Sequence, residues 1–216
     1  MKFVNFAKIF LILIVPVLIF LIVFNFASFS DSFFKNEFSK YGVNNKFINA
    51  DLLHQKVTDF IEGKSNELPS EFNAREKAHL ADVRKVISSL TITLYIMIAL
   101  FIILLIVSAF TLKVNSSIIN FTGKILMWGG ILTVAIAALL FLSLQFDFGA
   151  TFESMHRMFF QSGTYMFDPA KEAIVNLYPE QLFMDLGIKI SVWTLIIAVL
   201  TIIIGFYLII RTKNQK

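Results

Sequence analysis

The chain has 216 residues, of which 57% are apolar, and its 19 Lys and Arg against 15 Asp and Glu give a net charge of +4. So large an apolar fraction excludes an ordinary water-soluble domain and predicts an integral membrane protein. The chain has no cysteine, which excludes disulfides, a thiolate nucleophile and any cysteine-based metal site.

Four long runs without charged residues divide the chain. Each run reaches the roughly 20 residues that a helix needs to cross the hydrocarbon core of a bilayer. The sequence therefore predicts an all-α integral membrane protein built as a bundle of four transmembrane helices. The predicted divisions are a first span at 1–29, a helical extracytoplasmic segment leading into the next span at 30–85, a second span at 86–112, a cytoplasmic turn at 113–124, a third span at 125–146, an extracytoplasmic interfacial loop at 147–187, a fourth span at 188–211 and a cytoplasmic tail at 212–216.

The polar segments differ in the sign of their charges. All 15 acidic residues and all three histidines fall within 30–85 and 147–187, whereas the two termini and the turn at 113–124 contain only Lys and Arg. Because Lys and Arg are retained on the cytoplasmic side, both termini are predicted to be cytoplasmic and the acid-bearing segments extracytoplasmic. The positive net charge thus reflects orientation in the membrane and gives no reason to expect a nucleic-acid partner.

The first span has some features of a secretory signal peptide, because Lys2 and Lys8 precede its apolar stretch. The stretch is long, however, and no small-x-small cleavage site follows it. We therefore predict an uncleaved anchor, with a kink at Pro16 in mid-span.

Two helical stretches are predicted in the first outer segment. Apolar residues at 46–62 follow a 3.6-residue period. Pro69 then breaks the chain, and Asn73 stands three residues before Glu76, which is the pattern of a capping box. Nothing interrupts the helix from there to about Leu112, so one continuous helix is predicted to extend the second span out of the membrane.

The second outer segment, 147–187, is rich in Phe and Met and is divided into short pieces by Pro169 and Pro179. Short amphipathic pieces of this kind tend to lie in the plane of the membrane interface. We predict short amphipathic helices here.

Two histidines follow a glutamate at the same spacing, in Glu76-Lys-Ala-His79 and Glu153-Ser-Met-His156. On a helix, residues three apart share a face. Each histidine also stands at the polar end of an apolar stripe, and ionisable groups near membrane depth are functional candidates because they are costly. The alternative for each is an ordinary interfacial histidine beside a carboxylate. His54 has polar helical neighbours, so a solvated surface position is predicted for it.

Other classes of function are weighed against this pattern. Paired Glu-x-x-His is typical of di-iron carboxylate bundles, but the predicted spans contain no Asp or Glu to complete such a site. No Gly-x-Ser-x-Gly or phosphate-binding glycine loop is present, and the spans lack the polar midplane residues of a transporter. A metal-dependent membrane hydrolase and a non-enzymatic lipid- or partner-binding protein remain open, although no metal or other cofactor is expected.

The residues around both histidines resemble a known family. The first signature of the bacterial lipoprotein intramolecular transacylase (Lit) family is similar to Arg75-Glu-Lys-Ala-His-Leu-Ala-Asp-Val-Arg84. The second is similar to Met155-His-Arg-Met-Phe-Phe160, Phe167-Asp-Pro169 and Leu177-Tyr-Pro-Glu-Gln-Leu-Phe-Met-Asp185. The four-span layout with two outer segments also agrees, so the resemblance covers essentially the whole chain, with the least support from 30–66.

The resemblance implies an acyltransferase of the bacterial cell membrane with an outward-facing active site. Its substrate is a diacylated lipoprotein whose N-terminal cysteine bears a thioether-linked diacylglycerol and a free α-amine. The family moves the sn-2 acyl chain to that amine and gives a lyso-form lipoprotein. The expected partners are therefore diacylated lipoproteins and membrane lipid. Two histidines are held essential in the family, and His79 and His156 occupy the matching positions.

Ester aminolysis requires an unprotonated amine, a stabilised oxyanion and a proton for the leaving oxygen, but no acyl-enzyme. We expect His79 to be the general base and His156 the acid or the carbonyl-polarising partner, with the reverse assignment nearly as good. The two rings must then reach one substrate carbonyl. The supporting candidates are Glu76 and Asp82 to orient His79, Glu153 to orient His156, Arg75, Arg84 and Arg157 to bind the oxyanion or a lipid headgroup, and Tyr165 and Tyr178 as hydrogen-bond donors.

Overall fold

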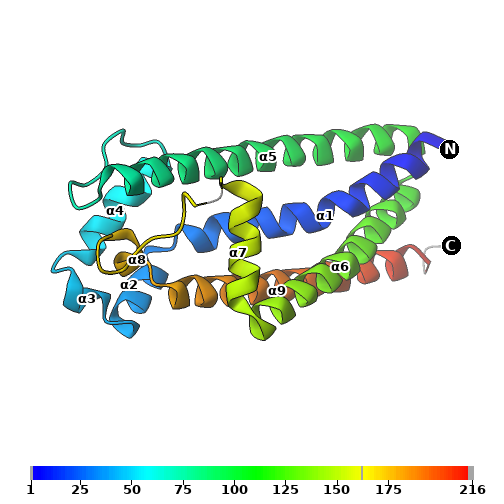
Figure 1. Cartoon of the computed structure of the whole chain (residues 1–216). Helices are drawn as coiled ribbons and strands as arrows, with labels where there is room; N and C mark the ends of the chain where they lie inside the picture. The colour runs from blue at the N-terminus through cyan, green and yellow to red at the C-terminus, as the bar shows by residue number, and fades with distance from the viewer. Residues whose placement is uncertain (1, 162, 214–216) are drawn as a thin grey trace. The chain divides into compact units, whose positions relative to one another are not determined.

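The computed structural model describes residues 2–161 and 163–213, and these contain nine α-helices and no strand (Figure 1). The all-α prediction is confirmed. The predicted cytoplasmic tail at 212–216 lies outside the described residues from 214 onward. The helices are α1 Lys2–Ser28, α2 Asp31–Lys40, α3 Val43–Lys46, α4 Ala50–Ile61, α5 Ala74–Leu112, α6 Asn115–Phe146, α7 Phe148–Phe159, α8 Ile174–Leu177 and α9 Glu180–Lys213.

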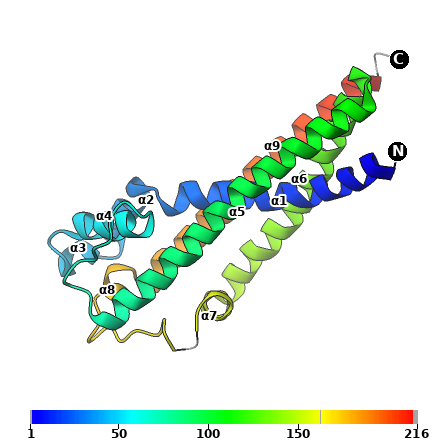
Figure 2. The same ribbon diagram turned by 90° about the horizontal axis from the view of Figure 1, so that it is seen from above.

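Four of the described helices, α1, α5, α6 and α9, are long and apolar enough to cross a membrane. This confirms the predicted number of spans. Figures 1 and 2 show α5 as one unbroken helix of 39 residues. Its start is the predicted capping box: Asn73 Oδ1 accepts from the backbone N–H of Glu76 (3.0 Å), and Glu76 Oε2 accepts from the backbone N–H of Asn73 (2.7 Å). These bonds satisfy N–H groups that have no partner within the helix.

The chain divides into two compact units. The first, here called the bundle unit, comprises residues 2–24, 92–142 and 189–213. In it α6 and α9 approach so closely that a Cβ on Gly205 would lie 2.5 Å from the backbone nitrogen of Met127. A Cβ on Gly123 would lie 2.8 Å from the carbonyl oxygen of Gly205. Glycines at such positions let membrane helices pack backbone against backbone.

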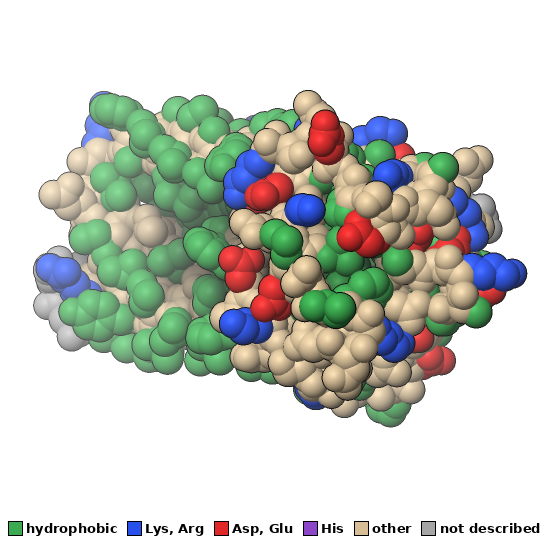
Figure 3. All heavy atoms as spheres, turned by 90° about the vertical axis from the view of Figure 1, so that its left-hand side faces the viewer, with side chains coloured by type: hydrophobic (Ala, Val, Ile, Leu, Met, Phe, Trp, Pro, Cys, Tyr) green, Lys and Arg blue, Asp and Glu red, His purple; other side chains and the backbone are tan. Residues whose placement is uncertain are grey.

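The second unit, here called the site unit, comprises residues 25–91, 143–161 and 163–188. It contains α2, α3, α4, α7 and α8 with the first turns of α5 and α9. Figure 3, viewed from the side of these short helices, shows basic and acidic side chains interspersed over this unit. The start of α9 is fixed to α2 because Asp185 Oδ2 accepts from the Tyr41 hydroxyl (2.5 Å) and pairs with Lys40.

The helix predicted at 46–62 is correct only from Ala50 onward. Phe47 has an extended backbone (φ −127°, ψ 112°) and ends α3, while Ile48 is completely exposed. Both residues match the apolar period, but the chain turns between α3 and α4 at this point. The periodic pattern therefore extended the predicted helix too far toward the N-terminus.

The prediction that His54 is solvated was wrong, since its residue is only 7% exposed. Its Nδ1 lies 2.9 Å from the hydroxyl of Tyr178, and its ring stacks on Phe34 with centroids 4.1 Å apart. Burial lowers the pKa of His54 to about 4. The residues that cover it come from α2 and from the turn before α9, so its own helical neighbours gave no sign of burial.

Candidate active site

His79 lies in the second turn of α5 and is only 7% exposed. Its ring packs against Phe160, with centroids 5.0 Å apart, and against Phe167 at 5.3 Å. Within residues 2–161 and 163–213, its Nδ1 is buried without a hydrogen-bond partner. A buried imidazole nitrogen that lacks a partner is costly unless a bound molecule or water supplies one. His79 therefore has unused hydrogen-bonding capacity inside an aromatic shell.

His156 lies near the end of α7, a helix that runs across the direction of the first turns of α5 (Figure 1). Its Nδ1 is 2.9 Å from the carbonyl oxygen of Phe152, and its ring packs against the rings of Phe152 (4.0 Å) and Tyr165 (4.9 Å). A carbonyl oxygen can only accept, so Nδ1 carries the proton. In the neutral ring, Nε2 then presents the lone pair.

The two histidine rings face one another, with centroids 6.5 Å apart and planes inclined by 19°. The two sequence motifs are 77 positions apart, yet α5 and α7 bring their histidines into one aromatic cluster. A group held between two rings at this separation touches both. The prediction that both rings reach one substrate carbonyl requires them to lie close together, and they do so here.

Both histidines are held in the neutral form by their surroundings. His79 precedes the uncharged stretch at 86–112 and lies among the charged turns of α5. Burial, followed by repulsion from a charge on His156, lowers the pKa of His79 to about 4. Burial also lowers the pKa of His156, opposed by its bond to the Phe152 carbonyl and by the charge of Glu153. The bond to the Phe152 carbonyl and the charge of Glu153 thus favour the protonated form of His156.

Glu76, predicted to orient His79, instead bonds to backbone. It is 1% exposed; its Oε2 accepts from the N–H of Asn73, and its Oε1 accepts from the N–H of Ile174 at 2.7 Å. Among the described residues both of these bonds go to backbone N–H groups, and His79 Nδ1 has no partner, so the direct orientation of His79 by Glu76 stays a prediction. Glu76 joins the start of α8 to the start of α5 and so fixes the backbone that carries His79.

Arg75, predicted to bind the oxyanion or a headgroup, is bonded within the protein. Its guanidinium pairs with Glu172 (3.1 Å) and donates to the carbonyls of Gly163 and Met166. It also lies over the ring of Phe167, 5.0 Å from the centroid. Because Phe167 packs on His79, Arg75 organises the loop that forms one wall of the histidine cluster.

Glu153, predicted to orient His156, bonds to two other side chains of the described chain instead. Its Oε1 accepts from the hydroxyl of Tyr165 (3.0 Å) and from Nε of Arg157 (2.8 Å), and these bonds lower the pKa of Glu153. Glu153 therefore acts on His156 through its charge and through the Tyr165 ring. Arg157 neutralises Glu153 and is mostly exposed.

Three other predicted supporting residues make hydrogen bonds and ion pairs with groups other than the histidine pair: Asp82, Arg84 and Tyr178. Asp82 pairs with Lys85, 2.9 Å away, and only its charge acts on His79, raising the pKa. Arg84 donates to the carbonyl of Ser65 and to Asn66. Tyr178, as described above, bonds to His54.

Sequence reasoning missed Glu172 and Phe160 as parts of this site. Glu172 is 6% exposed and accepts from Arg75 and from the backbone N–H of Asp168 (2.6 Å). Its sequence context, one acid among several in a loop, gives no signal of burial. In the described part of the chain, no three His, Cys, Asp or Glu side chains gather as a metal-binding group.

A family model described as "Lipoprotein intramolecular transacylase Lit" matches residues 5–183. The chain belongs to the Lit family. As a Lit protein it is an enzyme that acts on lipoprotein, and its four apolar helices make it a multi-pass bacterial membrane protein. The resemblance drawn from the two histidine motifs is confirmed.

The fold agrees with solved Lit structures. The membrane integral Lit from Bacillus cereus aligns with a TM-score of 0.81 at 18% identity, covering 99% of this chain and 98% of that one. Two variants of that protein, with a histidine replaced by arginine or by alanine, align with TM-scores of 0.80 and 0.79 at 17% identity. They cover 99% of this chain, and 95% and 96% of theirs. No curated protein sequence matches this chain.

Proposed function

We propose that this Lit protein moves the sn-2 acyl chain of a diacylglyceryl-cysteine lipoprotein to the α-amine of the same cysteine, between His79 and His156. Both termini are in the cytoplasm, and the histidines face outward at the membrane surface. The observation that carries the proposal is the buried pair of facing rings 6.5 Å apart. Within the described residues, one ring has a partnerless nitrogen and the other is fixed by a backbone carbonyl.

The tautomer of His156 favours it as the general base, which reverses our preferred assignment from sequence. Its Nδ1–H donates to the Phe152 carbonyl, so its Nε2 lone pair is free to take a proton. The carbonyl and the charge of Glu153 both stabilise the imidazolium that results. His79 has the charge of Asp82 but, among the described residues, no acceptor at Nδ1, and it serves as the neutral N–H donor to the developing oxyanion.

The reaction then needs no acyl-enzyme. The neutral amine attacks the sn-2 ester carbon and forms the C–N bond while Nε2 of His156 takes the amine proton. His79 donates a hydrogen bond to the carbonyl oxygen as it becomes an oxyanion. The tetrahedral intermediate collapses, the C–O bond to glycerol breaks, and His156 returns its proton to the glycerol oxygen. The product is an N-acyl, S-monoacylglyceryl cysteine.

The proposal is tested by mass spectrometry of a lipoprotein N-terminus. The host lacks apolipoprotein N-acyltransferase and carries either this gene or an empty vector. We expect the N-acyl, S-monoacylglyceryl peptide only with the intact chain. Unchanged diacylglyceryl peptide, with the protein present in the membrane, would overturn the proposal. Loss of product on adding a chelator would instead support the metal-dependent alternative.

The pH dependence of transfer follows from the neutral histidines. The α-amine of the substrate has a pKa near ~8, so the rate falls as pH decreases below that value. Because burial moves the pKa of His79 to about 4 and also lowers that of His156, we expect no second break near the ordinary histidine pKa. Initial rates in lipid from pH 5 to 9 measure this. An added break near ~6.5 would show that a histidine titrates normally in the enzyme.

The lowered pKa of His79 also affects the stability of the folded protein. The folded-state pKa of His79 is below the unfolded value, so the unfolded chain binds the proton more readily. The contribution of neutral His79 to folding is complete above the unfolded pKa and is lost as pH falls toward about 4. The melting temperature should therefore decrease over this range, and less so in His79→Phe.

A further inference from the structure

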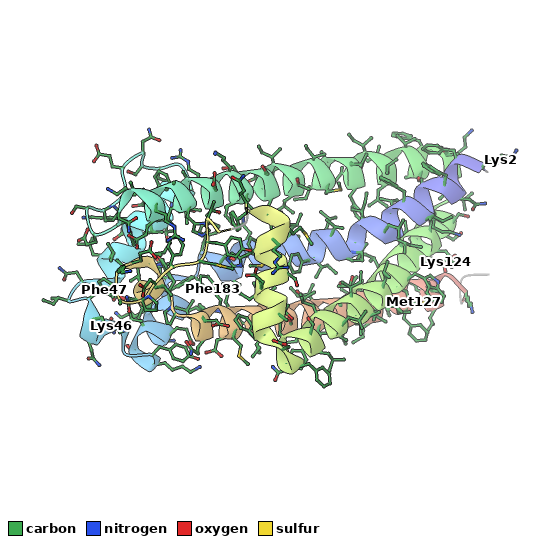
Figure 4. The ribbon with its side chains drawn as sticks, in the orientation of Figure 1. Lys2, Lys46, Phe47, Lys124, Met127 and Phe183 are labelled. Carbon is green, nitrogen blue, oxygen red and sulfur yellow. The ribbon has the colours of Figure 1, made fainter. Side chains whose placement is uncertain are left out.

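The bundle unit contains a cavity of about 440 Å³ that no part of the proposed reaction uses. Residues of α1, α5, α6 and α9 line it, at the end of the unit where both chain termini lie (Figure 1). Its wall includes three lysines, one from each of three helices: Lys8 of α1, Lys124 of α6 and Lys213 of α9. Figure 4 labels Lys124, which belongs to the first half of α6.

The three lysines have no counter-ion in the bundle unit. All Asp and Glu of the chain lie within 30–85 and 147–187, outside residues 2–24, 92–142 and 189–213. No ion pair among residues 2–161 and 163–213 involves Lys8, Lys124 or Lys213. Three like charges around one cavity repel one another, and an anion bound among them would relieve that repulsion.

The remaining wall is suited to phosphate oxygens. Ser116, Ser117 and Asn120 come from the first turns of α6, a helix of 32 residues with no acidic residue in its first turn. The first N–H groups of a helix lack intrahelical acceptors and carry a partial positive charge. Asn120 is held in place by its bond to Thr212 of α9 (3.1 Å). Residues that carry hydroxyl, amide and ammonium groups thus line one space at the start of α6.

We propose that this cavity binds the phosphate-bearing headgroup of an anionic phospholipid. The volume falls in the range of ligand pockets and exceeds what a bare phosphate fills, so a phosphodiester with its glycerol is accommodated. The cavity lies at the polar ends of apolar helices, where headgroups stand. On the predicted topology this is the cytoplasmic leaflet. The proposal concerns a different part of the chain from the histidine pair and does not depend on the transfer reaction.

The retention of basic residues on the cytoplasmic side explains why the charges at this end are positive. It does not explain why three lysines from three helices line the same cavity. Lys2, Lys113 and Arg211 are equally basic, come from the same three basic stretches of the sequence, and are not among the residues that line the cavity. They provide a control set of equal charge. A general attraction of the membrane surface for basic residues would treat both sets alike.

The test uses the full chain purified in neutral detergent and depleted of lipid. Phosphatidylglycerol is added, and its binding is followed by native mass spectrometry and by the shift in melting temperature. The cavity variant is Lys8→Gln/Lys124→Gln/Lys213→Gln, and the control is Lys2→Gln/Lys113→Gln/Arg211→Gln. We expect the control to bind as the parent does. In the cavity variant, affinity should fall by roughly fivefold for each lysine removed, and the shift in melting temperature should disappear.

Equal losses in the two triple variants would overturn the proposal, because they would show only general charge attraction. Inorganic phosphate alone giving the same stabilisation would make free phosphate the ligand and would overturn the lipid assignment. If the cavity triple fails to fold in phosphatidylcholine, the single variants Lys124→Gln and Lys113→Gln repeat the comparison with less disturbance. A difference between these two supports the site, and its absence overturns it.

Discussion

Replacing His156 with alanine should reduce the rate of N-acyl product formation by about 10²- to 10⁴-fold, the usual contribution of a general base. Replacing His79 with alanine should cost about 10²- to 10³-fold, as expected for one oxyanion donor. The measurement is the initial rate of conversion of a synthetic diacylglyceryl peptide in lipid, at equal amounts of folded enzyme. The physical reason is that the two histidine rings face one another across the cluster, 6.5 Å apart.

Glutamine variants separate the two roles. A glutamine amide donates a hydrogen bond but is not a base, so His79→Gln should be faster than His79→Ala by roughly tenfold, part of the contribution of an oxyanion donor. His156→Gln should be no faster than His156→Ala. The opposite pattern would restore the assignment of His79 as the base.

His54→Ala is the matched control for these variants. His54 is as buried as His79, and burial lowers its pKa to the same value of about 4. Its partner is Tyr178, away from the facing pair. We expect His54→Ala to lose stability while keeping its rate per folded molecule. An equal loss of rate in this variant would mean that activity follows the general stability of the site unit rather than the histidine pair.

Local sequence rules predicted the start of α5 correctly because a capping box depends on residues three apart. The same three-residue spacing also led to the prediction that Glu76 orients His79. A carboxylate has two oxygens, and here both accept from backbone N–H groups, of Asn73 and of Ile174 98 positions away. The helix pattern could show that Glu76 and His79 share a face, but not that α8 occupies that carboxylate.

The contacts of Arg75 and His54 escaped sequence reasoning for the same physical reason. Arg75 was predicted to bind the oxyanion or a headgroup, and in the structure Glu172 and two loop carbonyls bind it. His54 was taken as solvated, yet α2 covers it. In each case the partner is distant in sequence, and periodicity reports only which face of a helix a residue occupies. The spacing of the two motifs identified the histidines as candidates. The residues that surround them depend on how segments distant in the sequence pack together.

Arg75 and Glu76 are adjacent, and together they hold the loop that walls the histidine cluster. Glu76 fixes Ile174, and Arg75 fixes Glu172 and the carbonyls on either side of Tyr165. Between these points lies Phe167, which packs on His79. Arg75 and Glu76 therefore hold the loop against the start of α5. The same turn of helix thus positions both His79 and the aromatic residue that packs on it.

Glu76→Gln should then lower stability by about 1–3 kcal/mol, because the new amide NH₂ would meet a buried backbone N–H where an oxygen accepted before. It should also lower kcat more than it raises KM, since the loop that shifts carries Phe167, which packs on His79. The measurements are thermal unfolding and steady-state kinetics, at a temperature where the variant is fully folded. Glu67→Gln, the same change at an exposed loop position, is the control and should match the parent in both. If Glu76→Gln were destabilised but kept its full kcat when folded, Glu76 would hold the fold without positioning the histidine.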